Sequence, residues 1–490
     1  MPTTNPVLKL FRLSRPDAPP DAHPDAPPAP APASAPPPPL PPILRLPDEI
    51  LMMIIKFVMF DPCPGRGTIL SLRSLLGVCR RFNSIIEDAS ELWTFIHPKF
   101  PLTSRQVIFW EKALRGSVKL PDVPGNLSTS RKTPQRSRKP LDVVIEAGKP
   151  TIGKLELYDR FIQEVVKQSD RWRKFEITAI TWPPINRFLE LSNFVVSLPK
   201  LEKLVLRYLG TDQGPTTVFH NVLFGREVFA QRLHVIKVGA AYLDFPQMQS
   251  LARNLVELEL ENHRYPHTPG ILEEIADLLR ASPSLRTLIF VSIHLESGPA
   301  NTPQPVVLQE LEQLEFRGCP RDASSLLSLL RVPSLKGLLL GECTCRDGEH
   351  GSSAGMTTPI VDNLFTNPPN QAGGLSQLSL EYNDCPGEIL ETFLEHTSGI
   401  ETFRTSCPTA LPILAQNPSI LPGLRHLFLN KTIFYNLYPD FLAILDRPDI
   451  TLCVEGHLTS NGKKLYDTLK ARYKIEHRPD VLFPSSTLSL

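Results

Sequence analysis

The sequence predicts an α/β protein in which short parallel strands alternate with helices, preceded by a small all-α domain and a proline-rich tail. Three observations support this prediction. A six-residue apolar pattern recurs through residues 171–477, a helical pattern occupies residues 44–97, and Pro and Ala dominate residues 1–43. A chain of 490 residues can hold two or three domains or one elongated array of repeats.

The N-terminal tail, residues 1–43, includes the stretch SRPDAPPDAHPDAPPAPAPASAPPPPLPP. This composition favours polyproline II and lacks the apolar side chains needed for a core, so we expect a disordered tail. A spacer is the simplest role for it, and a docking peptide for a proline-recognising module is the alternative.

Residues 44–97 are predicted to form helices. Pro47 suits a first helical turn, and two acidic residues follow it at the positive end of the helix dipole. From Leu51 to Phe60 every residue except Lys56 is apolar, so this helix has almost no polar side. A second apolar helical pattern follows. Because so few residues cannot bury that much apolar surface, we expect another protein to cover part of it.

The repeat has the pattern apolar-x-x-apolar-x-apolar, with starts about 22 to 40 residues apart. Its copies are WRKFEI (172–177), LEKLVL (201–206), LHVIKV (233–238), LVELEL (255–260), LRTLIF (285–290), LEQLEF (311–316), LKGLLL (335–340), LSQLSL (375–380), IETF (400–403) and LRHLFL (424–429). Helix-like stretches lie between them. A strand plus a helix at this period predicts an irregular leucine-rich-repeat solenoid over residues 171–477. Cys319, Cys343 and Asn383 occupy the position where the repeat consensus has Asn or Cys.

Two further segments complete the predicted organisation. Residues 98–170 are expected to be a linker and the N-terminal cap of the solenoid, with an inserted basic loop at 116–140, and residues 478–490 form a C-terminal tail. The loop carries five Lys or Arg residues between positions 131 and 139. Such a run is a nuclear-import or polyanion-binding patch in some proteins and a solvated loop in others.

No catalytic, cofactor-binding or metal-binding group stands out. Gly456 and the Gly462-Lys463 pair resemble a phosphate-binding loop, but the spacing is one residue too long and a Lys replaces the Ser or Thr, so a tight turn at Asn461-Gly462 is the better interpretation. Cys343, Cys345 and His350 lack the spacing of a zinc site. We therefore expect a non-catalytic protein.

The charge and cysteine content also restrict the partners. A formal net charge of +1 produces no global field that would attract nucleic acid or an anionic membrane. Eight scattered cysteines suit a reducing compartment, and the sequence contains neither a signal peptide nor an apolar run that could span a bilayer. These features predict a soluble protein of the cytoplasm, the nucleus or both.

Three islands in residues 44–97 resemble the F-box: LPDEIL (46–51), LLGVCRRF (75–82) and LW (92–93). The loop between the first two helices, DPCPGRGT, is longer than is usual in that family. With the repeats that follow, the chain resembles F-box proteins with leucine-rich repeats that are expanded in mushroom-forming fungi. This resemblance implies a substrate receptor of an SCF (Skp–cullin–F-box) ubiquitin ligase, which binds a Skp-family adaptor, through it a cullin, and an unknown protein target.

The resemblance also implies roles for residues at matching positions. Those implied to contact the adaptor are Leu46, Pro47, Ile50, Leu51, Ile54, Leu75, Val78 and Cys79. Phe82 and Trp93 would hold the F-box helices together. In the strands, alternation directs the leucines into the core and the intervening residues to the concave face. The target-binding candidates on that face are Arg207, Lys237, Glu257, Glu259, Glu261, Ile289, Val291, Arg317, Leu339 and Phe428.

Two alternatives remain open at this point. The first is a scaffold that keeps the F-box and the repeats but promotes no ubiquitin transfer. The second, from another class, is a nucleotide-binding repeat protein that uses the turn at residues 456–463.

Overall fold

The computed structural model describes part of the chain and divides it into two compact units, residues 1–51 and 52–490, each described here by itself. The described residues are 46–60, 81, 85, 94–116, 139–149, 154–193, 195, 197–210, 229–239, 244–261, 264–265, 271–295, 304–318, 326–327, 329–341, 374–381, 387–430, 434 and 438–478. The predicted proline-rich tail and almost all of the predicted basic loop lie outside them, as do Cys319, Cys343 and Asn383.

Helix α1 spans Asp48–Phe60, close to the bounds that the sequence predicts. Pro47 precedes it, and its carbonyl accepts the first intrahelical bond from the backbone N–H of Leu51 at 3.0 Å. Asp48 and Glu49 occupy the first turn, where a negative charge interacts favourably with the helix dipole. The segment that resembles the F-box therefore begins in a helix.

The second unit is built on one sheet of 15 strands in which every neighbouring pair is parallel. The strand order is β1-β3-β4-β5-β6-β7-β9-β12-β14-β15-β16-β17-β18-β19, and β2 pairs with β3. The bounds are β1 (Phe95–Ile96), β2 (Lys99–Phe100), β3 (Leu141–Ala147), β4 (Trp172–Ala179), β5 (Lys203–Tyr208), β6 (Val235–Gly239), β7 (Glu257–Glu261), β9 (Thr287–Val291), β12 (Gln313–Arg317), β14 (Gly337–Gly341), β15 (Gln377–Glu381), β16 (Thr402–Thr405), β17 (His426–Asn430), β18 (Thr451–Glu455) and β19 (Ile475–Arg478). The sheet thus follows the order of the sequence, as an array of repeats would.

The main-sheet strands from β5 to β17 lie at the predicted hexads but begin two residues after the first apolar position, whereas β18 and β19 lie beyond the last predicted hexad. That first residue forms a tight turn instead. The backbone N–H of Leu255 donates to the carbonyl of Ala252 at 3.0 Å, and the backbone N–H of Leu285 donates to that of Ser282 at 3.2 Å. Both leucine side chains are fully buried. The first apolar residue of the hexad therefore anchors the turn, and the other two face the core.

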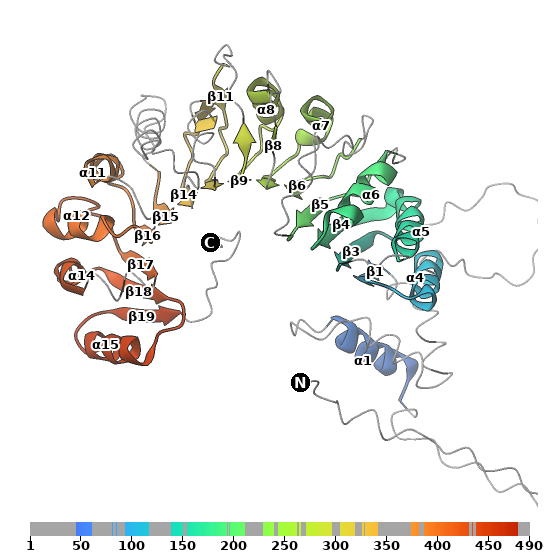
Figure 1. Ribbon diagram of the computed structural model, residues 1–490, viewed down its shortest axis with the longest axis horizontal. Coiled ribbons are helices and arrows are strands. Elements are labelled where there is room, and N and C mark those ends of the chain that lie inside the picture. The colour runs from blue at the N-terminus through green and yellow to red at the C-terminus, as the bar shows by residue number, and fades with distance from the viewer. Residues whose placement is uncertain are drawn as a thin grey trace, which may run out of the picture. The chain divides into compact units, whose positions relative to one another are not determined.

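Helices cover one face of this sheet (Figure 1). Their bounds are α4 (Ser104–Gly116), α5 (Leu155–Val166), α6 (Trp182–Ser192), α7 (Phe245–Ala252), α8 (Ile271–Arg280), α11 (Gly387–Glu395), α12 (Ala410–Gln416), α14 (Tyr438–Leu445) and α15 (Ser460–Lys470). Two short parallel pairs, β8 (Arg264–Tyr265) with β10 (His294–Leu295) and β11 (Val306–Val307) with β13 (Leu330–Arg331), lie apart from the main sheet. Apolar side chains between helices and sheet form the core.

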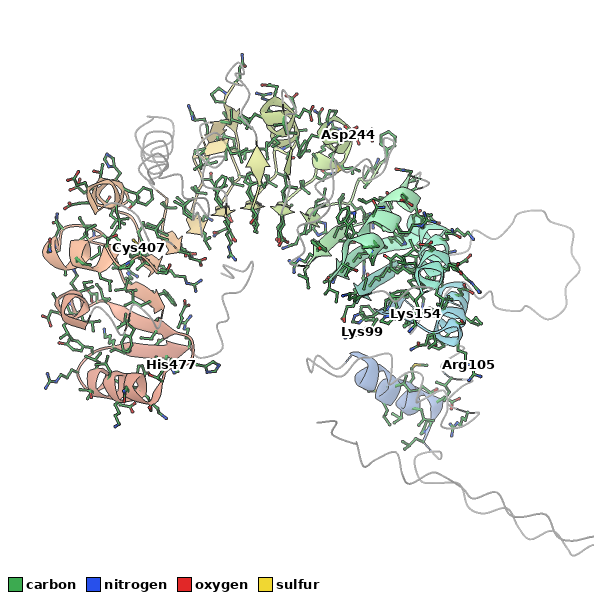
Figure 2. All side chains as sticks on the ribbon, in the orientation of Figure 1. Lys99, Arg105, Lys154, Asp244, Cys407 and His477 are labelled. Atoms are coloured by element: carbon green, nitrogen blue, oxygen red, sulfur yellow. The ribbon has the colours of Figure 1, made fainter. Side chains whose placement is uncertain are left out.

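Side-chain caps begin three of these helices, and before α4 the Thr103 Oγ1 accepts a hydrogen bond from the backbone N–H of Gln106 at 3.4 Å. Asp244, labelled in Figure 2, precedes α7, and its Oδ1 accepts a hydrogen bond from the backbone N–H of Gln247 at 3.2 Å. Thr459 caps α15, and its Oγ1 accepts a bond from the backbone N–H of Gly462 at 3.3 Å. The predicted tight turn at Asn461-Gly462 is therefore wrong, because both residues lie in the first turn of a capped helix.

A stacked aromatic column and one buried cation stabilise the start of the sheet. The rings of Trp172 and Phe175 stack with centroids 4.2 Å apart, and Phe188 of α6 continues the column at 4.8 Å. Arg171 is fully buried in the short 3-10 helix Ser169–Arg171 before β4. Its guanidinium donates to the Lys139 carbonyl at 3.1 Å, the Leu114 carbonyl at 3.4 Å and Oε1 of Gln168 at 3.2 Å.

Candidate functional site

The first candidate surface is one side of helix α1. Ile50 and Met53 are 41% and 65% exposed, whereas Leu51 and Ile55 are fully buried. Positions 50, 53 and 54 follow the spacing of one helix side, and positions 51 and 55 follow that of another. Helix α1 therefore has an apolar side that is covered within the chain and an apolar side that is open to a partner. We call Ile50 and Met53, with the half-buried Ile54, the α1 face.

The predicted adaptor-binding residues divide between these environments. Pro47 and Ile50 are exposed, Leu46 and Ile54 are half-buried, and Leu51 is buried. Met53 was not among the predicted residues, because an all-apolar helix does not reveal which side the chain itself covers. Leu75, Val78, Cys79, Phe82 and Trp93 lie outside the described residues.

The second candidate surface is the face of the sheet opposite the helices, which we call the open face. Pairing in register aligns its side chains into rows that cross the strands. The central row runs Val205, Lys237, Glu259, Ile289, Glu315, Leu339, Ser379, Arg404, Phe428 and Cys453. Flanking rows lie two residues to either side on each strand.

All ten predicted target-binding residues lie on the open face, but they are not equally accessible to solvent. The five in the central row are at most 8% exposed: Lys237, Glu259, Ile289, Leu339 and Phe428. The five in the flanking rows are half-buried: Arg207, Glu257, Glu261, Val291 and Arg317. A bound target would therefore contact the flanking rows first, while the central row supports them. Sequence alternation shows which face a residue occupies, not how far its neighbours cover it.

Lys237 joins the charges on β6 and β7. Its Nζ lies 2.5 Å from Oε1 of Glu257 and 3.0 Å from Oε2 of Glu259, and Arg207 Nη2 lies 3.6 Å from Oε1 of Glu259. Burial acts to lower the pKa of Lys237, but the two carboxylates outweigh it, so the pKa lies above the ordinary value for lysine. Lys237 therefore stays charged at neutral pH.

Glu315 is different, although Arg317 forms an ion pair with it. It is 9% exposed, and burial raises the pKa of its carboxyl to about 7. Arg317 acts in the opposite direction, while Glu381 and Glu259 raise the pKa further. Near neutral pH this carboxyl is therefore partly protonated, and a cation placed beside it would restore its charge.

A third group of charges lies towards the last strands. Arg404 Nη2 donates to Oε1 of the buried Glu455 at 2.7 Å. The guanidinium carbons of Arg404 and Arg478 lie 5.3 and 5.1 Å from the centroid of the Phe428 ring, within the range of cation–π contacts. This group is mutually satisfied and leaves little unpaired charge for a ligand.

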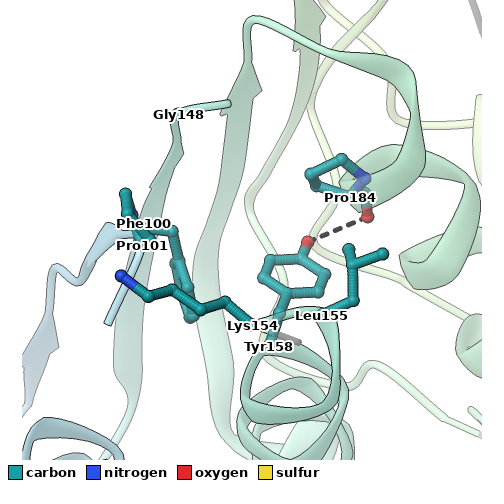
Figure 3. A pocket seen from close by; sticks show the side chains of 7 residues that line it. All are labelled: Phe100, Pro101, Gly148, Lys154, Leu155, Tyr158 and Pro184. Atoms are coloured by element: carbon teal, nitrogen blue, oxygen red, sulfur yellow. Dashed lines mark hydrogen bonds between the residues drawn. The ribbon is translucent and has the colours of Figure 1, made fainter. Parts of the chain in front are cut away.

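A small pocket lies beside α5 (Figure 3), lined by Phe100, Pro101, Gly148, Lys154, Leu155, Tyr158 and Pro184. The Tyr158 hydroxyl donates to the Pro184 carbonyl at 2.9 Å, and the Phe100 ring packs edge-on against Tyr158 at 4.9 Å. Burial raises the pKa of Tyr158 far above its ordinary range. Lys154 is the one charged residue of this lining, so the pocket presents no pair of groups for acid–base chemistry.

The described residues lack the features of a metal site and of a membrane-spanning helix. Within those ranges, no three His, Cys, Asp or Glu side chains are grouped as a metal site would require. Likewise, none of the helices there combines the length and apolar character needed to cross a membrane. Cys343, Cys345 and His350 fall outside the same ranges.

Comparison with known families identifies the N-terminal region. Residues 43–99 match the family model described as F-box-like, which contains helix α1 and the α1 face. The chain thus carries an F-box-like domain at its N-terminal end, and F-box domains in general bind Skp-family adaptors. A search of curated proteins found no match to this chain.

Proposed function

We propose that this protein is the substrate-recognition subunit of an SCF ubiquitin ligase. In this role the F-box-like domain binds a Skp-family adaptor, the adaptor joins the chain to a cullin, and the sheet holds a protein target. The observation that carries the proposal is the F-box-like match at residues 43–99, with two exposed apolar side chains on its first helix.

The α1 face is the proposed adaptor contact. Ile50 and Met53 would be the central anchors, with Leu46, Pro47 and Ile54 around them. Buried apolar anchors of this kind commonly contribute about 2 kcal/mol or more each to binding. Leu51 we assign to packing inside the chain, since its side chain is fully buried.

The rest of the chain is proposed to be an irregular leucine-rich-repeat solenoid, as in the F-box proteins of fungi that the sequence resembles. Its parallel strands in sequence order, each preceded by a leucine-anchored turn, support this assignment. The proposed role is non-catalytic. The receptor raises the effective concentration of a target lysine near the conjugating enzyme, while other subunits perform ubiquitin transfer.

The first experiment is co-expression of the full chain with a Skp-family adaptor, followed by affinity and size-exclusion purification. We expect a stable complex, and we expect Ile50→Ala with Met53→Ala to weaken binding at least 100-fold. Asp48→Asn is the control, because Asp48 is exposed on the same helix but is not apolar. A wild-type chain that folds but binds no adaptor would contradict the proposal.

The second experiment reconstitutes the complex with a cullin, a RING subunit and a charged conjugating enzyme. Because no target is known, ubiquitin transferred to the receptor's own lysines is measured. We expect transfer that depends on the adaptor and is lost in the Ile50→Ala, Met53→Ala variant. Adaptor binding without transfer would favour the alternative role of a non-ligase scaffold.

A further inference from the structure

The open face carries a surplus of carboxylates across strands β7, β9, β12, β14 and β15, a region that we call the acidic segment. Its charged side chains are Glu257, Glu259, Glu261, Glu315, Glu381 and the single cation Arg317. Lys237, Arg207 and Lys203 add three cations from β6 and β5. Five carboxyl groups therefore face four cations, on a surface where burial weakens solvent screening.

The carboxyl groups that are least well compensated lie at two places, on β7 and on β12. On β7, burial raises the pKa of Glu261 and the neighbouring Glu259 raises it further, although Arg207 acts against both. On β12, Glu315 has the raised pKa described above. Each carboxylate has a cation nearby that does not fully offset the cost of holding its charge. A positive charge from a ligand would be stabilised at both places.

Glycines let the carboxylates cross between strands. A Cβ atom added to Gly341 would lie 3.1 Å from Oε2 of Glu381 and 3.0 Å from Cγ of Arg317, so both side chains extend over this glycine. Gly239 shows the same arrangement on the other side of the segment, where an added Cβ would lie 3.4 Å from Oε2 of Glu261. The two glutamates therefore lie close to the glycines of the neighbouring strands.

Two polar side chains provide an observation independent of charge. Ser379 is 4% exposed, and its hydroxyl makes no hydrogen bond to any described residue. It lies in the central row of β15, between Leu339 and Arg404, on the same face as Glu381. The side-chain amide of Gln313 is likewise buried without a partner in the described part of the chain. Buried polar groups seldom stay unpaired, and both lie where a ligand on this face could bond them.

The distance between the two carboxylate sites restricts the ligand. β7 and β12 are separated by β9 alone, so the sites are two strand spacings apart, about 10 Å. A peptide in the polyproline II conformation advances about 3.1 Å per residue with three residues per turn, so side chains three positions apart lie on the same side and about 9 Å apart, close to that distance. Between the sites, β9 presents the apolar side chains of Ile289 and Val291.

We infer that the acidic segment binds a polyproline II segment of a protein target in which two Lys or Arg residues, three positions apart, flank an apolar residue. One cation pairs with Glu259 and Glu261, the other with Glu315 and Glu381, and the apolar side chain contacts Val291. The Ser379 hydroxyl accepts a hydrogen bond from the second cation. This inference rests on the proposed function, in which the open face receives the target.

The test uses the full chain purified with its adaptor and three fluorescein-labelled peptides in an anisotropy titration. The first is Gly-Ser-Lys-Val-Leu-Lys-Ser-Gly, the second places its two lysines side by side, and the third replaces both lysines with glutamate. We expect the first peptide to bind at least fivefold more tightly than the second, and the third to show no binding. Equal binding of the first two, binding of the third, or no binding of the first would overturn the inference.

Variants then locate the site. Glu261→Gln with Glu315→Gln should weaken binding of the first peptide at least tenfold, and Ser379→Ala alone should weaken it about threefold. The matched control, Glu273→Gln with Glu388→Gln, removes the same charge from α8 and α11 and should leave the affinity unchanged. Thermal unfolding verifies that each variant is folded. If the control variant weakens binding of the first peptide as much, then the loss of affinity comes from net charge alone. That result would contradict a specific site on the acidic segment.

Adaptor content, measured in the same samples, separates this inference from the proposed function. Selective peptide binding by a chain that fails to bind any adaptor would support the inference about the acidic segment and contradict the ligase role. Adaptor binding with no peptide selectivity would support the ligase role and contradict the inference about the acidic segment.

Discussion

The α1 face and the open face of the sheet expose opposite chemistry. On α1, apolar side chains remain exposed, and Met53 is 65% accessible. On the open face, charged side chains are buried, and Glu259 is 6% accessible. Association through the first surface depends on apolar burial, which salt hardly weakens. Association through the second depends on charge pairing, which salt and pH both change. Under the proposed function, the chain would therefore combine a contact that salt hardly affects with one that salt and pH adjust.

Arg171 can be compared with the buried charges of the open face, because it is a buried charge that lies elsewhere. Its guanidinium donates hydrogen bonds to three acceptors. Arg171→Met removes a donor from the buried Leu114 carbonyl and from the half-buried Lys139 carbonyl, so we expect a loss of about 3 kcal/mol in the free energy of unfolding. Urea denaturation of the purified chain measures it. Arg232→Met, at an exposed site, is the control. A loss below about 1 kcal/mol would show that water satisfies these carbonyls.

Glu315 should behave in the opposite way. Its folded-state pKa of about 7 exceeds the ordinary 4.5, so between these pH values the folded state holds more protons than the unfolded state. Stability contributed by this group therefore falls as the pH rises from about 4.5 to 7. The groups that act on it are Arg317, Glu381, Glu259 and Lys237.

Glu315→Gln removes that penalty. We expect the variant to be more stable than the wild type by about 2 kcal/mol at pH 8 and by much less at pH 5. Urea denaturation at both values measures the difference. Glu312→Gln is the control, because hydrogen bonding to Lys336 lowers rather than raises the pKa of Glu312. A Glu315→Gln variant that is less stable at pH 8 would show that the ion pair with Arg317 dominates.

Salt tests the comparison directly. Between about 50 and 500 mM salt, the Debye length falls severalfold, so affinity for the lysine peptide should fall at least tenfold. Adaptor affinity should change less than threefold, since Ile50 and Met53 carry no charge. Biolayer interferometry with both ligands in one salt series makes the measurement. A parallel loss of both affinities would abolish the distinction between the two surfaces.

The smallest effect concerns the end of β12. Gly318 has φ of 60°, and a Cβ atom there would lie 2.7 Å from Oγ of Ser292. Gly318→Ala should therefore cost about 1 kcal/mol of stability. Gly387→Ala is the matched control, because nothing lies within 4 Å of an added Cβ at that helix start. Equal thermal midpoints for the two variants would show that the turn at Gly318 relaxes without cost.

Most strand positions could be predicted from the sequence, because the hexads place leucines such as Leu258 and Leu260 in the core. The hexad pattern misses the segment LDVVIEA (141–147), although its alternation matches the burial pattern of β3. Two features of the candidate sites could not be predicted. Exposure of Met53 depends on what packs against the other side of α1, and burial of Glu259 depends on side chains from neighbouring strands.

Hydrogen–deuterium exchange with and without the Skp-family adaptor tests whether the α1 face is the adaptor contact. If the α1 face is the adaptor contact, exchange slows in peptides covering residues 46–60 and stays unchanged in peptides covering β7 to β15. Unchanged exchange over residues 46–60, in a sample where the adaptor is bound, would contradict the account.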